Sequence, residues 1–352
     1  MKTSKVLFFV VALVVLATMA SCAPAAPPAA APAATKVAEV VPTVAAVATK
    51  AAEVAPAACA KTYKDLTVGY AQLGSESEWR NANTASIKET AEQLGVKLQF
   101  SDAQQKQENQ IAAVRSFIQQ KVDVIGLPPV VTTGWETVLK EAKDAGIPVI
   151  LVDRRADVPE DLYASYIGSD FVEEGRNAGR TMAKIVNEKA NIVELVGTVG
   201  SAPATDRQKG FQEIIKDMPD MKMLDSQSGD FTRDGGKKVM EAFLKKYGKD
   251  ITAVYAHNDD MAIGAIQAIE EAGMKPGTDI KIVSVDAVRG AFEAMIAGKL
   301  NATVECNPLL GPQFYEMALK AVCGEQLPKW VPSKEGIYFP DNAKEILPTR
   351  KY

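Results

Sequence analysis

The chain has 352 residues, of which 47% are hydrophobic and 24% are charged, and its formal net charge at pH 7 is −4. It contains no basic run, so we expect no nucleic-acid partner. Beyond the N-terminal region there is no apolar stretch of membrane length, which argues against a multi-span membrane protein. Without the Ala- and Pro-rich N-terminal region, about 290 residues remain, and a chain of this length usually divides into two domains.

The N-terminus has the features of an export signal. Lys2 and Lys5 precede a mainly apolar run of 15 residues, 6–20, which is too short to span a bilayer. The segment Met19-Ala-Ser-Cys22 resembles a bacterial lipobox, although Met19 stands where leucine is usual. We expect 1–21 to be a lipoprotein signal peptide and Cys22 to carry a lipid that anchors an exported, extracytoplasmic protein to the membrane. Plain cleavage that discards Cys22 is the alternative.

Residues 22–61 are almost entirely Ala, Pro and Val, with a few Thr, Lys and Glu. This composition offers too few large apolar side chains to form a core, so we expect a disordered tether. Such a spacer lets the folded part reach a partner in the same membrane. Removal of 1–21 deletes two lysines and no acidic residue, which changes the net charge from −4 to −6.

From residue 66 onward, short apolar runs alternate with segments of helical periodicity, a pattern typical of parallel α/β layers. In the first half we expect strands at 66–73, 96–100, 122–127 and 148–152, and helices at 79–94, 107–120 and 135–145.

The second half repeats this plan, beginning with a strand at 163–167 and a helix at 172–186. Further strands are expected at 192–196, 224–226, 253–257 and 280–285, with helices at 206–216, 235–247 and 261–272. Two open parallel sheets in one chain direct the carboxyl ends of their strands toward a shared crevice, where ligands bind in such folds.

The last elements predict a hinge of three segments. Strands at 302–305 and 337–339 flank a helix at 313–322, which indicates that the chain crosses back to the first lobe and then returns. We therefore expect an α/β protein of two Rossmann-like lobes, each a parallel sheet flanked by helices. The N-terminal lobe comprises 62–167 and about 307–334, and the C-terminal lobe comprises 168–306 and about 335–352.

Candidate ligand-binding residues follow the predicted strands, where a cleft would lie. Glu76, Ser77, Trp79 and Arg80 come after the first strand. A Trp in a polar loop suits the apolar face of a sugar ring, while its neighbours bind hydroxyls. The alternative is a Trp that packs the first helix against the core.

An acid beside an arginine can hold adjacent sugar hydroxyls, because hydroxyls both donate and accept. Asp153 and Arg154 end the fourth strand, where an ordinary surface ion pair is the alternative. For Asp259 and Asp260, capping of the next helix is as good an interpretation as ligand binding. The remaining candidates at strand or helix ends are Arg207, Asp230, Phe231, Asn258, Asp286 and Glu305.

Enzyme chemistry is poorly supported. The chain has one histidine, His257, and no glycine-rich phosphate loop with its lysine. It also has no Cys/His metal spacing, so we expect neither a metal nor a cofactor. A glycosidase needs two carboxylates with separate roles, whereas the acids here stand beside cations.

Several segments together resemble the type I periplasmic sugar-binding proteins, in the ribose-binding group, over about residues 64–347. The matching segments are 74–80, 104–111, 134–136, 226–233 and 254–261, and within the family they are most similar to members that bind galactofuranose. The resemblance implies a periplasmic-binding-protein-like fold and a receptor for an ABC importer. Its partners would be a permease and an ATPase, and its ligand a monosaccharide such as galactofuranose or a similar furanose.

The resemblance also implies ring stacking by the first loop and hydrogen bonds from Asp153, Arg154, Arg207, Asn258 and Asp286. Two departures bear on which sugar is bound: Glu78 stands where the similar proteins have Gly, and Val285-Asp286-Ala287 replaces the usual Asp-Gly turn. We expect a monomer. A lipoprotein that presents the bound sugar to a membrane kinase or receptor is the alternative function, and a transcription regulator of this fold is contradicted by the export signal.

The cysteines permit one more prediction. Cys306 and Cys323 are separated by a helix of about 13 residues, or ~20 Å, so they should not meet. Cys59 and Cys323 should both lie at the pole of the first lobe away from the cleft. We therefore predict a Cys59–Cys323 disulfide, which export permits; three free thiols are the alternative.

Overall fold

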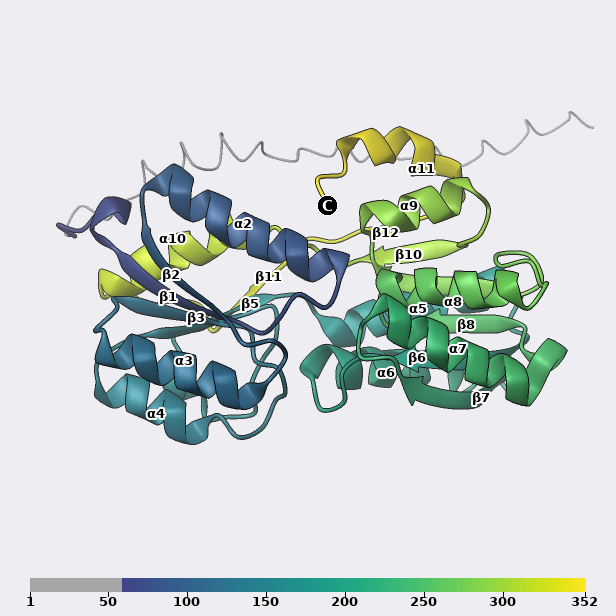
Figure 1. Cartoon of the computed structure of the whole chain (residues 1–352), viewed down its shortest axis with the longest axis horizontal. Helices are drawn as coiled ribbons and strands as arrows, with labels where there is room; N and C mark the ends of the chain where they lie inside the picture. The colour runs from purple at the N-terminus through teal and green to yellow at the C-terminus, as the bar shows by residue number, and fades with distance from the viewer. Residues whose placement is uncertain (1–58) are drawn as a thin grey trace, which may run out of the picture. The chain divides into compact units, whose positions relative to one another are not determined.

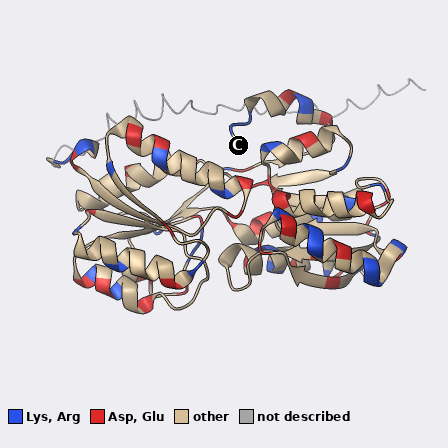
Figure 2. Cartoon of the chain, in the orientation of Figure 1, with Lys and Arg blue, Asp and Glu red and all other residues tan. Residues whose placement is uncertain are grey.

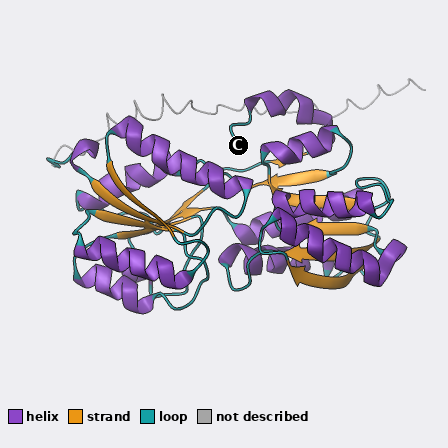
Figure 3. Ribbon diagram, viewed as in Figure 1, coloured by secondary structure: helices purple, strands orange, loops and turns teal. Residues whose placement is uncertain are grey.

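The computed structural model describes residues 59–352, so the predicted signal peptide, Cys22 and nearly all of the tether lie outside the described residues. Within 59–352 the strands form two six-stranded sheets (Figures 1 and 3). No helix in this part of the chain is long and apolar enough to cross a membrane.

The first sheet has the strand order β11-β5-β4-β3-β1-β2, and every neighbouring pair is parallel. Its strands are β1 (Thr67–Gln72), β2 (Lys97–Asp102), β3 (Val124–Leu127), β4 (Val149–Val152), β5 (Ser165–Gly168) and β11 (Trp330–Pro332). Its helices are α2 (Glu78–Leu94), α3 (Gln107–Gln119), α4 (Glu136–Asp144) and α10 (Gly311–Val322), with 3-10 turns η1 (Tyr63–Asp65) and η2 (Glu160–Leu162).

Alternation of side chains along β1 divides this lobe into two apolar layers. Val68 and Tyr70 pack with the helices α2 and α10 on one face, whereas Ala71 packs with α3 and α4 on the other. Figure 1 shows the two helix pairs on opposite faces of the sheet. The helix α2 begins at Ser77, whose side chain accepts a bond from the N–H of Arg80, and ends at Gly95 with φ 74°, a left-handed conformation that favours glycine.

The second sheet has the order β12-β10-β9-β8-β6-β7. Its strands are β6 (Ala190–Val196), β7 (Met221–Ser228), β8 (Ala253–Ala256), β9 (Lys281–Asp286), β10 (Ala302–Glu305) and β12 (Ile337–Tyr338). Its helices are α5 (Phe171–Ile185), α6 (Ala202–Ile215), α7 (Arg233–Tyr247), α8 (Asp259–Glu271), α9 (Arg289–Ile296) and α11 (Pro340–Ile346), with 3-10 turns η3 (Gly248–Asp250) and η4 (Leu347–Thr349). One face is covered by α5 and α6, and the other by α7, α8, α9 and α11.

The chain passes between the sheets at three described segments: 169–170, 306–310 and 333–336. The strand expected at 163–167 corresponds to β5, which pairs with β4 and belongs to the first sheet. This agrees with the expected N-terminal lobe of 62–167, whereas the placement of this strand at the start of the second half was wrong. Both sheets are parallel as expected, except that the edge strand β12 runs antiparallel to β10. The helices α9 and α11 and the edge strand β11 were not predicted from the sequence.

Cys59 and Cys323 form a disulfide with a Cα–Cα distance of 5.4 Å. Cys323 follows the last residue of α10, and Cys59 precedes η1. Cys306 lies before the start of α10 and is free and buried. The crosslink therefore joins the start of the described chain to the helix that the chain contributes when it returns to the first lobe.

Candidate functional site, a cleft between the two lobes

A small cavity lies between the lobes. Side chains from both sheets line it, together with one residue from the second crossing. The lining residues are Glu76, Ser77, Trp79, Arg80, Asp153, Arg154, Pro203, Arg207, Phe231, Asn258, Asp286 and Cys306.

Arg80 organises the acidic groups of the first lobe. Its Nη2 donates to Asp153 Oδ2 at 2.5 Å and its Nε donates to Glu76 Oε1 at 3.2 Å. Burial opposes the charge of Arg80, but the two carboxylates outweigh it and raise the pKa of Arg80. Because Nη2 and Nε of Arg80 are engaged in these hydrogen bonds, the guanidinium fixes the positions of both carboxylates at the cavity. The other oxygen of Glu76, Oε2, is buried and has no hydrogen-bond partner among the described residues.

Arg154 offers a free donor from the same lobe. Its Nη1 donates to the carbonyl of Val130 at 3.0 Å, whereas Nε is buried without a hydrogen-bond partner in residues 59–352. Nε lies 3.8 Å from Asp153 Oδ2, beyond hydrogen-bond distance. Burial, followed by the positive charge of Arg80, lowers the pKa of Arg154 to about 10. An unpaired buried donor is costly, so Arg154 is prepared to bind an acceptor in the cavity.

The second lobe contributes Arg207 from α6. Its Nε donates to Glu174 Oε2 at 2.7 Å, and its Nη1 donates to the carbonyl of His257 at 2.6 Å. Its Nη2 lies 3.5 Å from Asp286 Oδ1. These contacts fix the guanidinium at the floor of the cleft, where its planar edge faces Asp286.

Two aromatic side chains line the cavity. Phe231 has φ 62°, and the guanidinium of Arg154 lies 5.3 Å from its ring centroid. Trp79 is 5% exposed, and its Nε1 donates to the carbonyl of Cys306 at 2.6 Å. Trp79 lines the cavity and packs with the apolar cluster of the second lobe, not with the core of its own lobe as the alternative interpretation expected.

The segment that follows β8 separates three polar residues into different roles. Asn258 caps α8 by accepting from the N–H of Met261 and donates to the carbonyl of Phe231, with both distances 3.0 Å. The expected alternative, capping by Asp259 or Asp260, was therefore wrong. Asp259 accepts from Ser284, Thr303 and the N–H of Val288 in the core of the second lobe. His257 is fully buried and its Nε2 lies 3.0 Å from Glu194.

Two candidate residues do not line the cavity. Asp230 is exposed, and its carboxylate accepts from the hydroxyl of Ser228. Glu305 accepts from the hydroxyls of Tyr338 and Tyr352. Both carboxylates accept hydrogen bonds from hydroxyl groups within the protein, and their positions at strand ends do not reveal these partners.

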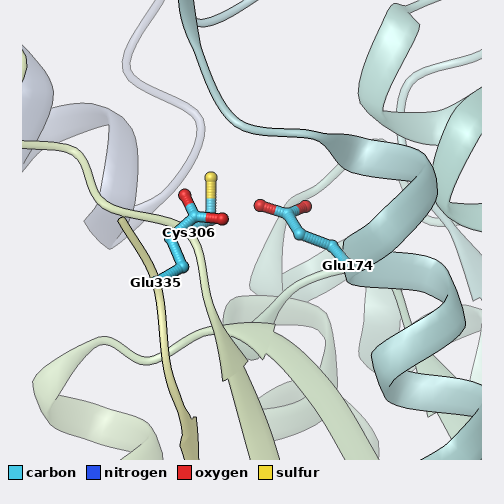
Figure 4. A group of neighbouring side chains, drawn as sticks. All are labelled: Glu174, Cys306 and Glu335. Atoms are coloured by element: carbon cyan, nitrogen blue, oxygen red, sulfur yellow. The ribbon is translucent and has the colours of Figure 1, made fainter. Parts of the chain in front are cut away.

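Two cavity residues, Pro203 and Cys306, were missed by the sequence analysis. Neither residue type carried a hydroxyl-binding signal, and Cys306 was considered only as a disulfide candidate. Figure 4 shows the Cys306 thiol beside the carboxyl group of Glu335, with the carboxyl group of Glu174 pointing toward them. Glu335 also accepts from the hydroxyl of Ser169 and from the N–H of Asn307. Together with Ser169, Cys306 and Glu335 bring one residue from each of the three crossings into this cluster.

Comparison with known proteins identifies the class to which this fold and cleft belong. Residues 68–326 match the periplasmic binding protein domain family, and the chain belongs to that family. The galactofuranose-binding protein YtfQ of Escherichia coli (strain K12) is 53% identical over 291 residues, covering 81% of this chain and 92% of YtfQ.

Solved structures give the same class. A Mycobacterium smegmatis protein in complex with β-D-fucofuranose is 54% identical, with a TM-score of 0.80, and the match covers 82% of this chain and 95% of that one. The binding protein of an arabinose ABC transporter from Shewanella sp. ANA-3, bound to α- and β-L-arabinofuranose, is 48% identical with a TM-score of 0.79; the match covers 81% and 95% of the two chains. The present chain is a sugar-binding periplasmic protein of this family.

Proposed function

We propose that this chain is the solute-binding component of an ABC sugar importer and that its ligand is a furanose, with galactofuranose the first candidate. The proposal is supported by relatives with 48–54% identity that are named for galactofuranose or were solved with fucofuranose or arabinofuranose. Side chains from both lobes line the cavity, and small-molecule sites commonly lie between domains.

The observation that carries the proposal is a free acceptor and a free donor beside the same cavity, Glu76 Oε2 and Arg154 Nε. A sugar hydroxyl can donate to the first and accept from the second. In addition, Trp79 and Phe231 offer apolar surface for the carbon face of a ring.

The ion pairs of the three cavity arginines favour a neutral sugar. Arg80, Arg154 and Arg207 each lie within 4 Å of a buried carboxylate, on Asp153, Glu76 and Glu174 respectively. A sugar acid or sugar phosphate would add a buried negative charge without a spare cation. We therefore assign the hydrogen bonds of a neutral ring to Asp153, Arg154, Arg207, Asn258 and Asp286, with Ser77 at the edge.

We further propose that Cys22 carries the lipid and that residues 22–61 serve as the tether. A monomeric receptor held at the membrane would then meet its permease and ATPase partners at high effective concentration. Metabolic labelling with a fatty acid should label the wild type, and Cys22→Ser should abolish the label.

Isothermal titration of residues 59–352 with a panel of pentoses and hexoses tests the ligand assignment. We expect binding of sugars that populate furanose rings, and a loss of at least tenfold in affinity for both Trp79→Ala and Arg154→Ala. If both variants keep their affinity within twofold, the cleft assignment is wrong. Preference for a pyranoside locked in its ring form would contradict the furanose assignment.

A further inference from the structure

One set of contacts joins the lobes at residues that do not line the cavity. The N–H of Glu78, the first residue of α2 in the first lobe, donates to Asp260 Oδ2 in the second lobe at 2.7 Å. The other carboxylate oxygen, Oδ1, accepts from Nε and Nη2 of Arg233 at 3.2 and 2.8 Å. Asp260 is 5% exposed, so this contact is shielded from water.

The two hydrogen-bond partners of Asp260, Arg233 and the N–H of Glu78, belong to different lobes. Arg233 and Asp260 both belong to the second lobe, so their pair persists whether the lobes are open or closed. The N–H of Glu78 belongs to the first lobe and meets Asp260 only when the lobes come together. Hinge closure around a ligand is the usual motion of periplasmic binding proteins.

The chemistry of this contact favours closure. The first N–H groups of a helix have no partner within the helix, and the helix dipole attracts a negative charge there. Ser77 already accepts from the N–H of Arg80, which leaves the N–H of Glu78 for Asp260. A hydrogen bond between a carboxylate and a buried N–H is worth more than a neutral one.

We propose that Asp260, held by Arg233, forms a closure latch on the amino end of α2, and that this latch raises sugar affinity without touching the sugar. The inference rests on the proposed binding function, because the latch acts by stabilising the sugar-bound, closed form. Two further ion pairs join the lobes, Arg155–Asp206 and Arg233–Glu78. Their arginine side chains are 41% and 49% exposed, and exposed ion pairs contribute little.

The position of Glu78 allows the N–H to be removed by itself. Proline lacks an N–H but is well tolerated at the first position of a helix, and the preceding Ser77 is extended, as a residue before proline should be. Glu78→Pro removes both the N–H and the carboxylate, whereas Glu78→Ala removes only the carboxylate. Their comparison isolates the latch bond.

Titration with L-arabinose and with D-galactose would measure the effect. Apparent Kd values depend on the furanose fraction in solution, but this fraction cancels in the ratio between variants. We expect Kd to be about three- to tenfold higher for Glu78→Pro than for Glu78→Ala, and Asp260→Asn to weaken binding by a similar factor. Measured relative to Glu78→Ala, the double variant Glu78→Pro/Asp260→Asn should lose less than the sum of the separate losses caused by Glu78→Pro and Asp260→Asn, because both changes weaken the same hydrogen bond. Asp234→Asn, an exposed acid beside Arg233, is the control and should bind like the wild type.

A sugar-independent measurement separates the latch from the ligand assignment. In an Arg155→Cys/Asp206→Cys background, a short bis-maleimide would join the lobes when they close. Without sugar, we expect crosslinking to be at least threefold slower with Glu78→Pro than with Glu78→Ala. Equal crosslinking rates, or Kd values within 1.5-fold for Glu78→Pro and Glu78→Ala, would overturn the latch. If neither sugar binds the wild type while the crosslinking rates differ, the proposed ligand fails and the latch stands.

Discussion

The carboxyl group of Glu335 accepts a hydrogen bond from the hydroxyl of Ser169. These residues belong to the third and first crossings between the lobes, and the N–H of Asn307, from the second crossing, donates to the same oxygen at 3.2 Å. One side chain therefore links all three segments of the hinge. Its protonation state should influence the stability of the protein.

Burial, followed by the negative charge of Glu174, raises the pKa of Glu335 from 4.5 to about 9. Between these two values the native state keeps a proton that the unfolded state has lost. The contribution of this group to stability is thus complete below pH 4.5 and declines as the pH rises toward 9. Glu335→Gln keeps the accepting oxygen but cannot ionise. We expect its Tm to exceed that of the wild type by a few degrees at pH 8, and to match it at pH 5.

Differential scanning calorimetry across this pH range measures the difference. Glu345→Gln alters an exposed acid of α11 and should leave the pH dependence unchanged. A Glu335→Gln variant that is less stable than the wild type at both pH values would show that the carboxyl is ionised in the native protein.

Arg154 and Arg155 are adjacent, yet only the first lines the cavity. Lysine keeps the charge of arginine but has neither the Nε donor nor the planar fork. We expect Arg154→Lys to reduce sugar affinity about tenfold or more, in line with the value of a hydrogen bond to a charged group. Arg155→Lys should change it less than threefold in the same titration. Similar losses for both variants would mean that charge alone, and not the Nε of Arg154, matters for binding.

Gly197 lies against the ring of Phe231. A Cβ at this position would approach the Phe231 ring atoms to 1.9 Å, so alanine must displace the ring. We expect Gly197→Ala to weaken sugar binding about as much as Phe231→Ala does, with little change in far-ultraviolet circular dichroism. If Gly197→Ala binds normally, Phe231 does not contact the sugar.

The Cys59–Cys323 disulfide closes a long loop, with a sequence separation of 264. Disulfides of this kind stabilise proteins by about 2–5 kcal/mol. We expect the double variant Cys59→Ser/Cys323→Ser to lose stability in this range in urea titrations, and to keep wild-type sugar affinity because neither cysteine lines the cavity. Denatured, unreduced protein comprising residues 23–352 should show one reactive thiol, from Cys306. Three reactive thiols would rule out the disulfide.

Local sequence patterns determined most of the architecture. The strands β3, β4 and β8 each have four residues, all of them buried. They appear in the sequence as short apolar runs, so they can be identified without knowing which strands pair with them. The same patterns indicated two lobes and a chain that returns to the first, and most of the cavity residues follow from their positions after strands. The three-residue strand β11 is different. It carries no usable periodicity, because its conformation comes from pairing with β5.

Only the tertiary structure decided which polar atoms are used within the protein and which remain for a ligand. Glu305 and Asp286 both end strands, but Glu305 is engaged by two tyrosines while Asp286 faces the cleft. The meeting of Ser169, Cys306 and Glu335 likewise depends on three crossings that are far apart in the chain. Sequence determines which side chains lie at the ends of strands through local periodicity, whereas the partners of those side chains depend on how distant segments pack.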